Sequence, residues 1–339
     1  MCIRDRFNNK GYKLADEIEE KIEHYILDEK LPECTNIGRY ERDENLKNKY
    51  INFLYSLAND YNGLKVVVDC ANGSASATAP TLFEKLNVNA EIIFDNPDGV
   101  NINDNCGSTH LESLISKVKE TGADLGIAYD GDADRCLLVT NDGDVIDGDY
   151  VLAICGKYLK EKGRLNNNAI VGTVMSNLGL KKFCESENIN FVATKVGDRY
   201  VLEEMLDKDY MIGGEQSGHV IFKEYANTGD GELTSLMVLN ILSERKCKLS
   251  ELASIMDKYP QVLVNVNVTK EGKTSFGEDA EINALIKKYE EELNGDGRIL
   301  IRASGTENLI RVMIEGKNTE EISRMANDIA DLINKKFGI

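Results

Sequence analysis

The sequence predicts an α/β fold made of successive doubly wound units, followed by a smaller C-terminal α+β domain. In residues 64–147, and again in residues 149–247, short β-branched or apolar runs alternate with stretches of helical periodicity. Alternation of this kind is typical of sheets whose parallel strands are joined by helices. After Pro260 the order changes to β-α-β-β-α, which is typical of a small α+β domain.

Apolar periodicity assigns the individual elements, and clusters of Asn, Asp and Gly separate them. The main expected strands are residues 64–69, 91–94, 125–129, 136–140, 145–146, 169–174, 191–196, 262–268, 298–301 and 309–314. The main expected helices are residues 14–26, 44–58, a helix ending near 86, 109–121, 150–162, 178–187, 200–206, 229–242, 280–293 and 319–335. The expected domains are 1–60 (the remnant of a larger domain), 61–148, 149–258 and 259–339.

The chain is strongly acidic, with 58 Asp and Glu against 40 Lys and Arg and a formal net charge of −18. Nucleic acids and anionic membrane surfaces would repel it, so we expect neither as a partner. The eight cysteines form no C-x-x-C pair, and several lie in apolar runs, as buried thiols do. With no signal peptide and no apolar run long enough to span a bilayer, this predicts a cytoplasmic location.

The chemistry centres on residues 125–135, where an apolar run ends in Asp130, Asp132 and Asp134. Small residues between the acids let the loop curl, so that three carboxylates can converge and bind Mg²⁺. An EF-hand loop would need glycine and glutamate where Arg135 and Asn141 stand, so that alternative fails. A solvated acidic turn is the other interpretation. A preceding buried strand favours the metal site, since α/β sheets bind ligands at the carboxyl ends of their strands.

Four motifs stand in a fixed order: Asp-Gly-Asp-Ala-Asp-Arg at 130–135, Lys-Val-Gly-Asp-Arg-Tyr at 195–200, Gly-Glu-Gln-Ser-Gly-His at 214–219 and Arg-Ala-Ser-Gly-Thr-Glu at 302–307. From residue 7 to the end, the sequence resembles the α-D-phosphohexomutase superfamily, and most closely the bacterial members that act on glucosamine phosphates. The resemblance implies the interconversion of glucosamine 6-phosphate and glucosamine 1-phosphate for cell-wall precursor synthesis. A phosphoserine and a bisphosphate intermediate carry that reaction, and Mg²⁺ lies on the three aspartates.

The resemblance also assigns roles around the metal loop. Arg135 is a charge-neutralising guanidinium or a structural partner of the aspartates, and both interpretations stay open. Glu215 and Ser217 are interpreted as the pair that reads the sugar hydroxyls. His219 is a general base or a structural turn histidine. Lys195 faces the substrate or is a solvated loop lysine.

The last motif resembles a phosphate-binding loop. Arg302 can hold a phosphate bidentately, while Ser304, Gly305 and Thr306 supply hydroxyl and backbone donors. Arg311 on the next strand belongs to the same cluster or is an ordinary strand arginine. Proline usually follows the glutamate in the family, and Asn308 stands there instead.

The family's Ser-Ala-Ser-His-Asn-Pro motif does not occur in the sequence. We therefore expect a chain truncated just after the nucleophile, in which residues 1–6 are foreign, and no turnover by this polypeptide alone; mutase activity of the purified chain would contradict this. The alternatives are a relative that acts on glucose or mannose phosphates and a non-catalytic sugar-phosphate binding protein. The sequence leaves the oligomeric state open.

Overall fold

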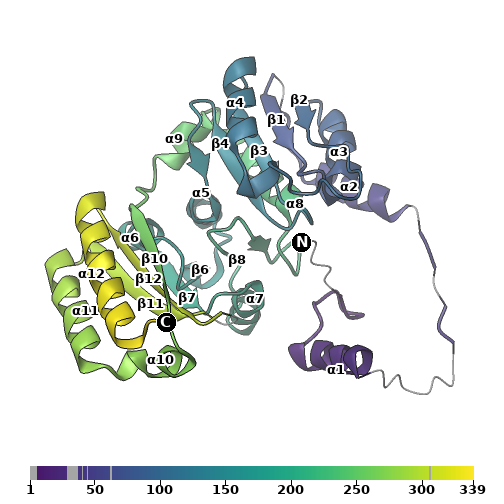
Figure 1. Cartoon of the computed structure of the whole chain (residues 1–339). Coiled ribbons are helices and arrows are strands. Elements are labelled where there is room, and N and C mark those ends of the chain that lie inside the picture. The colour runs from purple at the N-terminus through teal and green to yellow at the C-terminus, as the bar shows by residue number, and fades with distance from the viewer. Residues whose placement is uncertain (1–5, 29–36, 40, 44, 62, 305–306) are drawn as a thin grey trace. The chain divides into compact units, whose positions relative to one another are not determined.

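The computed structural model describes residues 6–28, 37–39, 41–43, 45–61, 63–304 and 307–339. The chain divides into two compact units, one formed by Met1–Ser176 with Cys184–Ile255 and the other by Asn177–Phe183 with Met256–Ile339. Figure 1 shows the course of the chain through both units. The expected domain boundaries stay a prediction.

The N-terminal part forms two helices, α1 (Asp16–Leu27) and α2 (Leu46–Ser56), close to the expected positions. Helix α2 buries Ile51 and Leu54. Helix α1 instead exposes Ile26 and Leu27, whose accessible fractions are 61% and 70%. A helix without a buried stripe contributes little to a core.

The first sheet has the strand order β2-β1-β3-β4-β5. Its strands are β1 (Lys65–Asp69), β2 (Asn89–Ile93), β3 (Leu125–Tyr129), β4 (Cys136–Thr140) and β5 (Val145–Ile146). Strand β1 pairs in parallel with β2 and β3, and β4 joins β3 in an antiparallel arrangement and forms the expected hairpin with β5. Helix α3 (Ala79–Lys85) and helix α4 (Glu112–Thr121) complete the α/β pattern (Figure 1).

Helices cover both faces of this sheet. Ala128 packs in a cluster with Leu114 and Val118 of α4. The next residue, Tyr129, points to the opposite face and hydrogen-bonds through its hydroxyl to Ser235 of helix α8 (Gly231–Arg245), over 2.8 Å. Strand β3 is therefore buried on both sides, as its continuous apolar run predicts.

The second sheet has the order β7-β6-β8-β9. Its strands are β6 (Ala169–Thr173), β7 (Asn190–Thr194), β8 (Ile212–Gly214) and the short β9 (Val220–Phe222), which the sequence pattern did not reveal. The helices in this stretch of the chain are α5 (Gly148–Glu161), α6 (Leu178–Ser186), α7 (Asp198–Asp207) and α9 (Leu249–Ala253), and α6 is divided between the two compact units. Val171 packs against α7, whereas Ile170 lies against Gly156 of α5. The prediction of two successive α/β units in residues 64–147 and 149–247 is confirmed.

The second unit is built on the antiparallel sheet β10-β12-β11. Its strands are β10 (Gln261–Asn267), β11 (Gly297–Ala303) and β12 (Leu309–Gly316), and its helices are α10 (Lys270–Ser275), α11 (Ala280–Leu293) and α12 (Thr319–Phe337). Ile310, Val312 and Ile314 of the central strand enter one core with Ile322 and Ile329 of α12. The α+β prediction is confirmed, and β10 lies at the sheet edge as expected.

Among the described residues, no helix is both long and apolar enough to cross a membrane.

Candidate metal and sugar-phosphate site

The acidic loop begins where β3 ends. Carboxylate oxygens of Asp130, Asp132 and Asp134 lie within 4.8 Å of one another. Asp130 is largely buried, Asp132 is exposed and Asp134 is half-buried. Three converging oxygen donors that differ in exposure suit a hard divalent cation, which keeps some positions for water or substrate.

The three carboxylates of this cluster repel one another. Burial, together with the neighbouring charges of Asp134 and Asp132, raises the pKa of Asp130 to about 7, against a backbone hydrogen bond from Arg135 that lowers it. A bound cation would remove that repulsion, so the donor set fits Mg²⁺.

Backbone hydrogen bonds with three other segments hold the loop. The N–H of Ser74 donates to the carbonyl of Gly131 over 2.9 Å, and the N–H of Gly231 donates to the carbonyl of Ala133 over 2.8 Å. The N–H of Cys136, just after the loop, donates to the carbonyl of Gly218 over 3.1 Å. The loop is thus hydrogen-bonded to the part of the first unit that contains the first sheet and to the part that contains the second.

Glycines make these approaches possible. A Cβ on Gly73 would lie 2.2 Å from the carbonyl oxygen of Gly131, and one on Gly231 would lie 2.5 Å from that of Arg135. Gly218 adopts a φ of +95°, and its Cβ would lie 2.5 Å from the carbonyl oxygen of Cys136. A side chain at any of the three would displace the loop.

A cavity of about 460 Å³ opens over the loop and gathers most of the first-unit residues that the sequence predicted. Its described lining residues are Lys13, Asn103, Thr109, Asp130, Gly131, Asp132, Asp134, Arg135, Val196, Gly197, Asp198, Glu215 and His219. Segments far apart in sequence therefore converge on the carboxylates, as a binding site requires.

Arg135 lies directly beside the triad. Its Nε is 4.0 Å from Asp130 Oδ2 and 4.0 Å from Asp134 Oδ1. That Nε is buried and has no hydrogen-bond partner, although the side chain as a whole is 42% exposed. The guanidinium thus contacts the aspartates and borders the cavity, so both interpretations of Arg135 stay open.

Of the two residues interpreted as reading the sugar hydroxyls, Glu215 is among the described residues that line the cavity and Ser217 is not. Glu215 lines the cavity, where its Oε1 accepts a hydrogen bond from the N–H of Gly197 over 2.9 Å. Ser217 is exposed and is not among the described lining residues. Lys195 is also outside that lining, and its Nζ lies 5.8 Å from the centre of the Tyr200 ring. The roles of Ser217 and Lys195 stay predictions.

His219 is buried, with 2% of its surface exposed. Its Nε2 accepts a hydrogen bond from the N–H of Gly229 over 3.2 Å, which assigns the proton of the neutral ring to Nδ1. The same Nε2 lies 3.5 Å from Asp134 Oδ2 and 3.7 Å from Asp198 Oδ2. Burial lowers the pKa of His219 more than these carboxylates raise it. His219 therefore holds a backbone group beside the metal loop, and its role as a base stays a prediction.

Sequence reasoning missed Lys13 and gave no site role to Asp198 of the 195–200 motif, yet the two form an ion pair at the cavity. Burial alone would raise the pKa of Asp198, but the ion pair with Lys13 outweighs it and lowers that pKa. No local sequence signal links them, because 185 positions separate the two residues.

The predicted phosphate loop belongs to the second unit. Arg302 of β11 lies directly opposite Arg311 of β12 in the strand register. Like charges at such a pair repel each other, and an anion would relieve the repulsion. Ser304 is buried, and its Oγ accepts a hydrogen bond from the N–H of Glu307 over 3.3 Å. Gly305 and Thr306 lie outside the described residues.

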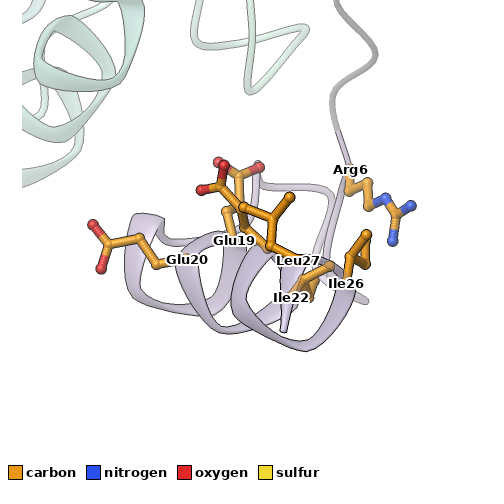
Figure 2. Close-up of a pocket in the computed structure, with 7 residues that line it drawn as sticks. Arg6, Glu19, Glu20, Ile22, Ile26 and Leu27 are labelled. Carbon is orange, nitrogen blue, oxygen red and sulfur yellow. The ribbon is translucent and has the colours of Figure 1, made fainter. Parts of the chain in front are cut away.

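A further cavity, of about 580 Å³, lies along α1 (Figure 2). Arg6, three glutamates and the apolar side chains of Ile22, Ile26 and Leu27 line it. It shares none of its lining with the metal-loop cavity, and it contains none of the four motifs.

Comparison with known proteins decides the family. Models of phosphoglucomutase/phosphomannomutase match residues 48–143 as alpha/beta/alpha domain II, residues 147–259 as alpha/beta/alpha domain III and residues 263–332 as the C-terminal domain. The phosphoglucosamine mutase of Caldicellulosiruptor saccharolyticus is 52% identical over 338 residues, which are 98% of this chain and 75% of that protein. The chain belongs to the phosphoglucosamine mutase family. The family resemblance read from the four motifs is confirmed.

Further relatives agree. The phosphoglucosamine mutase of Clostridium novyi is 51% identical over 335 residues, covering 97% of this chain and 75% of its own length. Among solved structures, a phosphoglucomutase/phosphomannomutase family protein of Burkholderia thailandensis matches with a TM-score of 0.77 at 24% identity, over 95% of this chain and 70% of that one. An N-acetylphosphoglucosamine mutase of Aspergillus fumigatus matches with a TM-score of 0.68 at 21% identity, over 88% and 72%. The phosphoglucosamine mutase family consists of isomerases, and the structures show that the fold is that of the phosphohexomutases.

Proposed function

We propose that the metal-loop cavity binds Mg²⁺ together with a hexosamine phosphate, in the interconversion of glucosamine 6-phosphate and glucosamine 1-phosphate. The observation that carries this proposal is the convergence of the carboxylate triad with Arg135, Glu215 and His219 in one cavity of about 460 Å³. The Aspergillus fumigatus structure, which is described as a complex with GlcNAc-6P and magnesium, supports the same pairing of ligands.

Each lining residue has a distinct task in this proposal. Asp130, Asp132 and Asp134 hold Mg²⁺, which when bound neutralises negative charge on phosphoryl oxygens. Arg135 stabilises the charge that spreads over the moving phosphoryl group. Glu215 accepts hydrogen bonds from sugar hydroxyls, with its orientation fixed by the N–H of Gly197.

Arg302 and Arg311 form a phosphate-binding pair in the second unit. Their opposition across β11 and β12 places two guanidinium groups on one face of the sheet, and this supports recognition of a dianion. Ser304 supplies a hydroxyl at the end of the same strand.

The cysteines support a reducing compartment. Cys70, Cys106, Cys136, Cys155, Cys184 and Cys247 are all free thiols, and the first five are buried. Free buried thiols are typical of a reducing environment. We infer a cytoplasmic location.

Calorimetric titration of the full chain tests the proposal. We expect glucosamine 6-phosphate to bind in the presence of Mg²⁺ and to bind several-fold more weakly with EDTA. Glucose 6-phosphate and mannose 6-phosphate serve as competitors, and stronger binding of either would favour a relative that acts on those sugars. If none of these phosphates binds, the proposal is wrong.

A further inference from the structure

We propose that Tyr50 of helix α2 is a positioning residue of the metal loop, which it supports through Asp230 at the start of α8. This inference rests on the proposed function, because it concerns the Mg²⁺ that the loop would hold. Tyr50 lies outside the four sequence motifs, and it is not among the described residues that line the metal-loop cavity. It therefore acts on the site without contacting metal or substrate.

The first contact joins Tyr50 to Asp230. The hydroxyl of Tyr50 donates a hydrogen bond to Asp230 Oδ1 over 2.8 Å. The same Oδ1 accepts the N–H of Leu233 over 2.9 Å, so Asp230 is the N-cap of α8. Tyr50 is half-buried, and the α2 residues Ile51 and Leu54 are buried, so packing holds the helix that carries the tyrosine. One carboxylate oxygen thus links α2 to the first turn of α8.

The second contact joins the start of α8 to the metal loop. The N–H of Gly231, which follows Asp230, donates to the carbonyl of Ala133 over 2.8 Å. That carbonyl belongs to the peptide bond between Ala133 and Asp134, so the hydrogen bond orients the backbone at which Asp134 begins. Ala133 has a φ of +61°, in the left-handed region that residues other than glycine rarely adopt. A hydrogen bond from outside the loop therefore helps to keep this conformation.

The short segment that carries Asp230 is closely packed. The N–H of Gly229 donates to His219 Nε2 over 3.2 Å. A Cβ on Gly231 would lie 2.5 Å from the carbonyl oxygen of Arg135, which shows how near this backbone lies to the loop. In such close packing, a small shift of Asp230 is transmitted to the loop. Groups that orient metal ligands in this way influence metal affinity without touching the metal.

Tyr61 provides a matched control, because its hydroxyl also bonds to α8. Tyr61 is buried, and its hydroxyl donates to Asn240 Oδ1 over 2.5 Å. Asn240 lies ten residues beyond Asp230, which is about 15 Å further along the helix axis. Tyr50→Phe and Tyr61→Phe therefore remove the same kind of bond to the same helix, but only the first bond lies next to the metal loop.

Calorimetric titration of the full chain with Mg²⁺ alone tests the assignment. Tyr50→Phe should bind Mg²⁺ about tenfold more weakly than the unsubstituted chain. Tyr61→Phe should stay within about twofold, because the bond that it loses is far from the loop. Both variants should lower the midpoint of urea unfolding to a similar extent, since each loses one hydrogen bond. If Tyr50 only anchored α2, Tyr50→Phe would lower the midpoint and leave Mg²⁺ affinity unchanged.

Substitutions of Asp230 test whether Tyr50 acts through it. Asp230→Asn and Asp230→Ser both remove the charge, and both keep a side chain that caps helices well. Only asparagine keeps an oxygen as far from the backbone as the Oδ1 that Tyr50 contacts. Asp230→Ser should therefore bind Mg²⁺ about tenfold more weakly than Asp230→Asn. Adding Tyr50→Phe should weaken binding further in Asp230→Asn but not in Asp230→Ser.

The possible failures are distinguishable. If the unsubstituted chain binds no Mg²⁺, the proposed function itself is wrong. If it binds Mg²⁺, and Tyr50→Phe binds the ion as tightly as Tyr61→Phe does, only the assignment of Tyr50 is wrong. Equal Mg²⁺ affinities of Asp230→Asn and Asp230→Ser would also overturn the assignment, and this comparison decides the matter if Tyr50→Phe does not fold.

Discussion

The metal loop and the Arg302–Arg311 pair both gather like charges, but they do so by different structural means. In the metal loop, backbone hydrogen bonds with three other segments fix the course of the chain, and the acids of residues 130–134 lie close together there. In the second unit, the register of two neighbouring strands places Arg302 opposite Arg311 without any special loop. The acids of the loop repel one another, and two arginines at directly opposed strand positions do so too, although Arg311 also pairs with Glu307 over 3.6 Å. An ion of opposite sign would relieve either repulsion. Under the proposed function, the negative cluster would bind a cation and the positive pair would bind an anion.

The largest effect is expected from Asp130→Asn in the metal loop. Mg²⁺ binding, measured by calorimetry, should weaken at least about 100-fold because a charged ligand is lost. The Mg²⁺-free variant should nevertheless be more stable than the unsubstituted chain at pH 8, by about 2 kcal/mol in urea unfolding.

The sign of this stability change follows from the raised pKa of Asp130, about 7 in the folded chain against an ordinary 3.8. Between these values the unfolded chain is ionised while the folded chain keeps its proton, so the stability of the folded chain falls as pH rises. In Asp130→Asn the side chain carries no titratable proton, so this decrease in stability with rising pH disappears. Asp142→Asn, in an exposed acidic turn, is the control. Equal loss of Mg²⁺ affinity in both variants would contradict the metal site.

Glu232 in α8 is a buried carboxyl outside the metal loop, so it shows how a buried acid behaves where no Mg²⁺ is expected to bind. Burial raises its pKa to about 8, against a hydrogen bond from the hydroxyl of Thr78, and its Oε2 has no hydrogen-bond partner. Stability should therefore fall as pH rises from 4.5 to 8, and Glu232→Gln should be about 2 kcal/mol more stable at pH 8.

Urea unfolding at pH 5 and pH 8, with and without Mg²⁺, measures this difference. Mg²⁺ should suppress the pH dependence that comes from Asp130 but leave that of Glu232 unchanged. The exposed Glu290→Gln should change neither. If Mg²⁺ also abolished the effect of Glu232→Gln, the two carboxyls would not be independent, and the contrast between them would fail.

The smallest of the three effects is expected from Arg311→Met. Removing one guanidinium should weaken glucosamine 6-phosphate binding about tenfold. Stability without ligand should change little, because the substitution removes both the repulsion with Arg302 and the exposed ion pair with Glu307. Arg298→Met is the contrasting variant on the same sheet. Arg298 pairs with the fully buried Glu315, so its loss should cost about 3 kcal/mol in stability. If Arg311→Met were equally destabilising, Arg311 would be a structural residue.

The features that depend on residues close together in the sequence were predictable. The buried β3 followed by Asp130 follows from an apolar run that stops at a Gly/Asp cluster, and the shift to an α+β unit follows from the order of elements after Pro260. The short strand β9 escaped prediction, because three residues are too few to show an alternating pattern.

Long-range contacts were not predictable. Lys13 meets Asp198 across 185 positions, and Glu315, which reads as a strand-end glutamate, is buried and accepts a hydrogen bond from Asn177 Nδ2 over 3.0 Å. Ser217 lies within a recognisable motif, yet its side chain is exposed on the turn. A motif indicates which chemistry is present, but packing determines which of its side chains face the cavity.

The backbone hydrogen bonds that hold the acidic loop also determine how short a fragment of the protein could keep the loop intact. Residues 48–143 match one family domain, but two of the loop's contacts come from Gly218 and Gly231 in the next. An excised 48–143 polypeptide would lose those supports and should capture Mg²⁺ poorly even if its own sheet forms. We therefore expect that the smallest fragment able to hold the proposed Mg²⁺ site comprises two domains, so engineering of the site would treat both domains as one part.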